Sequence, residues 1–254
     1  MKTVIKNIAL GCVLGSSFAF SVYADVTDTI EKSFDVNANS HFSLENINGE
    51  VNISSWSESV IKVEATIRAD NQSEFDRVDV KIKQSGQQVS VETDYEENSS
   101  WGNNQSAQVT YKVWLPTDTN LSKIELVNGS LSIENVAGKI NAQVVNGSIK
   151  ATGLTSNSEI SSVNGSIKAY YQGASSDLKD IDIETVNGSI KLYLPKDISA
   201  NLDLETMHGS IKTEFGLSSQ ENTFTGHSLR GDIGSGDVDI NMESVNGSIK
   251  VMKK

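Results

Sequence analysis

Residues 127–167 read VNGSLSIENVAGKINAQVVNGSIKATGLTSNSEISSVNGSI and contain three copies of one motif, Val-Asn-Gly-Ser-(Ile/Leu). The motif recurs twice towards the C-terminus, a Met-His-Gly-Ser-Ile variant lies between those two copies, and an Ile-Asn-Gly-Glu-Val variant occurs near the N-terminus. The motif glycines, spaced from the second onward by 18, 18, 23, 21 and 38 residues, are Gly49, Gly129, Gly147, Gly165, Gly188, Gly209 and Gly247. Such a period is typical of repeat architectures.

Two all-β interpretations fit this repeat. Asn-Gly between apolar residues indicates a two-residue hairpin turn, which would make the chain a rack of β-hairpins. A continuous strand instead places Val127, Gly129 and Leu131 on one inward face, and such a set recurs every nine residues over five segments. We therefore favour a β-solenoid with nine-residue half-coils and two strands per 18-residue coil. The motif glycines would point inward, where a side chain would push the two sheets apart.

The pattern divides the chain into four regions. We expect a signal peptide in residues 1–24, N-terminal strands and the first repeat in 25–56, an antiparallel cap in 57–120 and the repeat solenoid in 121–254. The cap region leaves the nine-residue pattern and shows longer alternating strands, which would cover an open end of the solenoid. At the other end, the charges of Lys253 and Lys254 would protect the last strand from pairing.

The N-terminal segment predicts export. Lys2 and Lys6 precede a short apolar stretch and small residues up to Ala24, which is the layout of a cleavable signal peptide. Cleavage would remove Cys12, the one cysteine, and would change the net charge from −12 to −14 because two lysines leave. We expect the periplasm, with the cell surface or the medium as alternatives, no membrane-spanning segment after cleavage and no nucleic-acid partner.

The repeat also suggests candidate contact residues. Five lysines, each three residues after a motif glycine, would stack into an outward basic column: Lys150, Lys168, Lys191, Lys212 and Lys250. This column could contact an anionic envelope polymer, or it could keep the surface soluble and discourage aggregation. A second candidate is the polar loop of residues 94–106, where Tyr95 and Trp101 could contact carbohydrate or protein.

The sequence offers little for catalysis or metal binding. His41, His208 and His227 lie far apart in the chain, and the nucleophile-elbow motif is absent. Alternating carboxylates at residues 180–184 and 237–241 could bind calcium, but they lack the glycine and glutamate of a calcium loop, so we interpret them as solvated strand faces. We predict a non-enzymatic protein with no catalytic residue, no cofactor and no metal ion.

The combination of a signal peptide, a Leu-Pro-x-Asp strand end and serial Val-Asn-Gly-Ser-Ile repeats resembles a known family. These features are similar to the exported bacterial β-solenoid domains classed as adhesins of unknown function, and the resemblance covers residues 35–254. It implies a binding or structural module of the envelope, with a polymer or protein as partner. The alternative it implies is a periplasmic accessory of an envelope-stress system or a partner of a sensor. The family supplies no catalytic residues to carry over.

Overall fold

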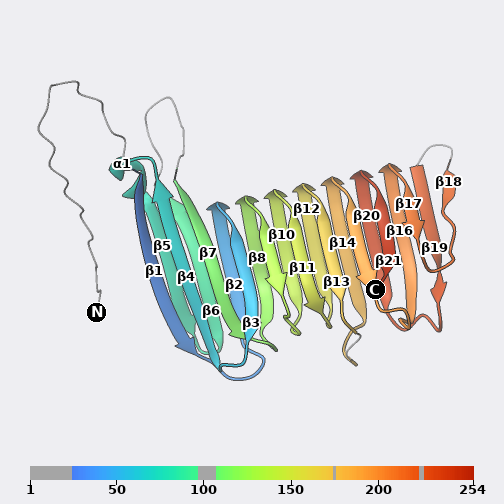
Figure 1. The fold of residues 1–254 in the computed structure, drawn as a ribbon, viewed down its shortest axis with the longest axis horizontal. Coiled ribbons are helices and arrows are strands. Elements are labelled where there is room, and N and C mark those ends of the chain that lie inside the picture. Colours follow the sequence, from blue (N-terminus) through green and yellow to red (C-terminus); the bar gives the residue numbers. More distant parts are fainter. Residues whose placement is uncertain (1–24, 97–106, 174–175, 223–225) are drawn as a thin grey trace, which may run out of the picture.

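The computed structural model describes residues 25–96, 107–173, 176–222 and 226–254, and these residues form two large β-sheets (Figure 1). The ten strands of sheet A, in spatial order, are β1 (Val26–Asp35), β4 (Val60–Ala69), β7 (Gln108–Pro116), β3 (Val51–Trp56), β9 (Leu131–Glu134), β11 (Ile149–Leu154), β13 (Ile167–Tyr171), β15 (Ile190–Leu194), β21 (Ile249–Lys253) and β17 (Ile211–Thr213). A short helix, α1 (Gln72–Phe75), follows β4.

Sheet B lies opposite sheet A and has eleven strands. In spatial order they are β18 (Gln220–Asn222), β19 (Gly226–Ile233), β16 (Ala200–His208), β20 (Asp239–Asn246), β14 (Asp180–Asn187), β12 (Ser158–Asn164), β10 (Ile140–Asn146), β8 (Asn120–Asn128), β2 (His41–Asn48), β6 (Gln88–Tyr95) and β5 (Val78–Ser85). The apolar side chains between the two sheets form one continuous core. Within the described ranges, no helix has the length and hydrophobicity that crossing a membrane would require.

The repeat region is a β-solenoid, as predicted. Each coil contributes one strand to each sheet, and neighbouring coils pair in parallel. In the coils β8–β9, β10–β11 and β12–β13 the offset is 18 residues, so that Ala142 lies beside Ile160 and Ile149 beside Ile167. The alternative of a hairpin rack is wrong, because β10 and β11, which flank an Asn-Gly pair, lie in different sheets. The Asn-Gly pair turns the chain from one sheet to the other.

The predicted inward register is wrong at the motif itself. Leu126 is 2% exposed, whereas Val127, which was expected to face inward, is 39% exposed. In β10 every second side chain, namely Ile140, Ala142 and Val144, is buried in the core. This alternation stops at the corner and resumes at Ile149. The physical reason is that Val-Asn-Gly-Ser is the corner, where the two-residue period of a strand does not continue.

The coils do not follow the chain in simple order. At the C-terminal end, β20 lies between β14 and β16, and β21 lies between β15 and β17. Lys253 and Lys254 therefore do not protect the end of the solenoid, because the last strand is inside sheet A. The 38-residue interval contains β18 and β19, which pair antiparallel beyond β16 and end sheet B.

The N-terminal end is built by extending both sheets instead of laying a separate sheet across them. β6 and β7 pair in parallel with β2 and β3, and thus form a further coil beyond the first repeat. β5 then adds antiparallel to sheet B, whereas β4 and β1 add antiparallel to sheet A. Sheet A consequently reaches one strand further than sheet B at this end.

Candidate binding surfaces

The motif corner is a site of close backbone approach. A Cβ atom on Gly165 would lie 1.8 Å from the carbonyl oxygen of Gly147 in the neighbouring coil, and one on Gly247 would lie 1.7 Å from that of Gly188. The same stacking holds at Gly129, Gly147, Gly188 and Gly209, while Gly49 approaches the carbonyl of Val109. Glycine is therefore required because coils approach along the stacking direction, and not because a side chain would separate the two sheets.

Polar side chains satisfy these corners. The motif asparagines form a ladder in which the side-chain Nδ2 of one donates to the side-chain Oδ1 of the next at 2.8–2.9 Å, through Asn48, Asn128, Asn146, Asn164, Asn187 and Asn246. His208 takes the corresponding place beside Asn246. Just before the corner, buried hydroxyls donate to motif glycine carbonyls, for example Thr206 Oγ1 to Gly247 O at 2.8 Å. The ladder thus serves stacking.

The structure brings the five predicted lysines together on the outward face of sheet A. Lys150 lies beside Lys168, Lys168 beside Lys191, Lys191 beside Lys250, and Lys250 beside Lys212. Neighbouring strands in a sheet are about 4.8 Å apart, so this column extends over roughly 19 Å. Among the described residues, no carboxylate lies within ion-pair distance of any of the five.

An aromatic pair lies next to this lysine column. Tyr170 and Tyr193 are neighbours on β13 and β15, two residues beyond Lys168 and Lys191 and therefore on the same face. Their rings are stacked, with centroids 4.2 Å apart and planes at 5°. Sequence reasoning missed this pair, although the matching positions of the two tyrosines within their repeats could have indicated it. The face thus combines cationic and aromatic groups.

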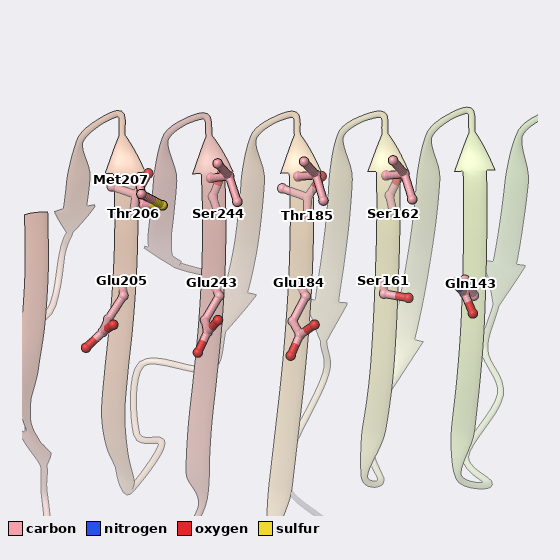
Figure 2. Close-up of a pocket in the computed structure, with 13 residues that line it drawn as sticks. Gln143, Ser161, Ser162, Glu184, Thr185, Glu205, Thr206, Met207, Glu243 and Ser244 are labelled. Atoms are coloured by element: carbon pink, nitrogen blue, oxygen red, sulfur yellow. The ribbon is translucent and has the colours of Figure 1, made fainter. Parts of the chain in front are cut away.

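The outward face of sheet B carries the opposite charge. Glutamates at one strand position lie in a column that runs through Glu92, Glu45, Glu125, Glu184, Glu243 and Glu205, with Gln143 and Ser161 in the middle. A groove on this face is lined by Glu184, Glu243 and Glu205 of the column and by the exposed motif residues Val186, Val245 and Met207. Figure 2 shows the three glutamates in a row on neighbouring strands. Glu205 is partly neutralised by Arg230, at 2.9 Å.

The remaining candidates from the sequence do not assemble into a site. Tyr95 is the last residue of β6, so it precedes the loop in which it was expected, and burial raises the pKa of its hydroxyl to about 12. Trp101 lies outside the described residues. Asp180 and Asp239 are strand neighbours, yet no group of described His, Cys, Asp or Glu residues is arranged to hold a metal ion.

Comparison with known families agrees with this repeat geometry. Residues 119–252 match the family described as Toastrack DUF4097, which is more than half of the chain. The chain belongs to the Toastrack DUF4097 family. The match covers the solenoid from β8 onward, including the inserted C-terminal strands. No curated protein matches the chain.

Solved structures resemble this chain over most of its length. One is a candidate cell adhesion protein from Clostridium sporogenes, with 17% identity, a TM-score of 0.55 and coverage of 89% of this chain and 100% of that one. Another is a candidate adhesin from Bacteroides fragilis, with 14% identity, a TM-score of 0.43 and coverage of 88% and 97%. At 17% identity, the similarity to the Clostridium sporogenes protein establishes a shared fold and nothing more.

Proposed function

We propose that this Toastrack protein is a non-enzymatic, exported binding module of the bacterial envelope. Its lysine column on sheet A, defined by Lys150, Lys168, Lys191, Lys250 and Lys212, would contact an anionic envelope polymer. The observation that carries this proposal is the strand register, which places five lysines side by side with no described carboxylate within ion-pair distance. Export is supported by the signal-like segment before residue 25.

Electrostatics explains why such a column suits an anionic ligand. Like charges directly opposite each other on neighbouring strands destabilise a sheet. The rest of the chain is acidic, with a net charge of −12, so carboxylates were available to neutralise these lysines. None of the described carboxylates nevertheless lies within ion-pair distance of the five. A linear polyanion lying across the strands would relieve the repulsion and displace small counterions.

The aromatic pair extends the same surface. The stacked rings of Tyr170 and Tyr193 lie directly beside Lys168 and Lys191, so they offer an apolar contact next to two positive charges. Rigid aromatic side chains add contact area at low entropic cost. The combination favours a polymer with both anionic groups and apolar ring faces, such as an acidic polysaccharide. The description of the Clostridium sporogenes relative as a candidate adhesion protein agrees with a binding role.

Binding to alginate, a polymer of uronic acids, tests the proposal. Replacing the five column lysines by glutamine should weaken alginate binding at least tenfold at low salt, because each replacement removes one positive charge from the contact surface. The matched control replaces five lysines outside the column, with the same change in net charge: Lys83, Lys139, Lys179, Lys196 and Lys254. The control should bind within about twofold of the natural protein.

Three results would contradict the proposal. The first is equal loss of binding in both five-lysine variants, which would indicate an effect of net charge alone. The second is alginate binding that neutral dextran reproduces or that does not weaken between low and high salt. The third is binding to anionic phospholipid vesicles without binding to alginate, which would assign the surface to a membrane.

A further inference from the structure

The two ends of the solenoid expose edge strands of very different length. At the C-terminal end the edges are β17 and β18, with three residues each. At the N-terminal end the edge of sheet A is β1, with ten residues, all of them paired with β4 on one side. No described strand pairs with its other side. Short edges discourage pairing with other chains, whereas a long edge with free backbone groups invites it.

β1 also lies beyond the cover of sheet B. Three strands extend sheet A past β3, but only two extend sheet B past β2 (Figure 1). The inner face of β1 is therefore only partly covered, by contacts with β5, and its apolar side chains Ile30 and Phe34 are only partly buried. A second β1 placed alongside would reduce this exposure without altering the fold.

The charges on β1 decide which partner fits. The side chain of Lys32 reaches inward and donates to the carbonyl oxygen of Ile82 on β5 at 3.0 Å, so the even-numbered residues form the inner face. Asp28 and Lys32 lie on that face, two positions on either side of Ile30. Inward-pointing charges on an edge strand block indiscriminate pairing. Pairing is favourable only where the partner strand neutralises both charges.

We propose that β1 pairs antiparallel with β1 of a second copy, with Ile30 opposite Ile30 on a twofold axis. On the inner face, this register places Asp28 opposite Lys32 and Val26 opposite Phe34, each twice, so that there charges meet opposite charges and apolar side chains meet apolar ones. Moving the axis to Asp28 or Lys32 would oppose like charges. Moving it to Thr29 or Glu31 would oppose Ile30 to a charged residue. Among these five axes, the inner face of β1 therefore favours the one at Ile30.

The dimer would be an end-to-end rod with one continuous sheet A. A twofold axis perpendicular to that sheet keeps both lysine columns on the same surface. If the proposed function holds, the dimer presents two columns to one polymer chain, which would raise the apparent affinity through avidity. That consequence rests on the proposed function, whereas the dimer itself does not.

Analytical ultracentrifugation of residues 25–254 tests the dimer directly, without any polymer. Asp28→Lys and Lys32→Asp should each raise the dissociation constant at least tenfold, because each opposes like charges across the axis. The double variant Asp28→Lys/Lys32→Asp should return it to within about threefold, since the exchanged charges pair again. A monomer at 100 µM protein (roughly the highest concentration practical for this measurement), or a double variant no better than the single ones, would overturn the proposal.

Cysteine crosslinking tests the register. The described chain contains no cysteine, so one introduced by Ile30→Cys would lie on the axis, next to its own copy. A short bismaleimide should crosslink this variant into a covalent dimer. In the control Val26→Cys, the two cysteines would lie eight residues apart along the paired strands. This is a distance of about 27 Å, so they should not crosslink. Crosslinking of Val26→Cys, or none of Ile30→Cys, would overturn the proposed register.

Discussion

Single residues at the coil corners determine how closely the coils can stack. The carbonyl oxygen of one motif glycine occupies the place where a side chain of the next would begin, and this recurs from Gly49 to Gly247. Hydrogen bonds between the motif asparagines run along the same edge of the molecule. Glycine is required at the corner for steric reasons. Backbone conformation does not explain it, because four of the seven motif glycines do not adopt the left-handed (positive φ) conformation that favours glycine.

Replacing one of these glycines should destabilise the protein strongly. Gly165→Ala would place a methyl group 1.8 Å from a backbone oxygen, which cannot move without shifting a whole coil. We expect a loss of about 3 kcal/mol or more in the free energy of unfolding, at or above the usual range for overpacking. Urea denaturation followed by circular dichroism measures it.

Gly173→Ala is the matched control for this prediction. A Cβ atom there would have no heavy atom within 4 Å, so its stability should change by less than about 0.5 kcal/mol. Equal effects of the two substitutions would show that stacking does not set the requirement for glycine.

At the scale of the strand, the two faces differ sharply in what they tolerate. β8 ends with Leu126 inside the core and Val127 on the surface, although both are apolar and adjacent. The motif valine therefore lies on the surface, where Val127, Val186 and Val245 are exposed, and the last two line the groove on sheet B. The more variable position before it, which is leucine, valine, serine or threonine, faces inward.

Two substitutions in β8 test this assignment of faces. Leu126→Asp buries an unpaired carboxylate and should cost about 4 kcal/mol or more. Val127→Asp should change the stability by less than about 0.5 kcal/mol, because the side chain is on the surface. Thermal unfolding of both variants gives the comparison. A larger loss for Val127→Asp would restore the inward register that the nine-residue pattern suggested.

The whole molecule should lose stability in alkaline solution. Burial raises the pKa of Tyr171, Tyr111 and Tyr95 above the ordinary value near 10. In the unfolded chain these hydroxyls would ionise near pH 10, whereas the folded protein keeps them protonated. Their contribution is thus fully present below pH 10 and is lost as the pH rises above it, by at most about 1.4 kcal/mol per pH unit for each tyrosine.

Urea denaturation at pH 8, 10 and 11 measures this dependence. Tyr171→Phe removes one of the buried hydroxyls, which bonds to Ser158 at 2.6 Å, so the variant starts less stable but should lose less between pH 10 and 11. An unchanged loss in the variant would contradict the assignment of the alkaline effect to buried tyrosines.

The sequence by itself determined the β-solenoid, the 18-residue coil and the lysine column, because all three follow from local periodicity. Only the tertiary structure decided that the corner lies at Val-Asn-Gly-Ser, that β20 and β21 enter between earlier coils, and that β1 forms a long edge. The physical reason is that parallel coils of similar sequence offer nearly equivalent neighbours. Which neighbour a strand chooses depends on long-range pairing and on covering the ends, and neither leaves a periodic signal in the chain.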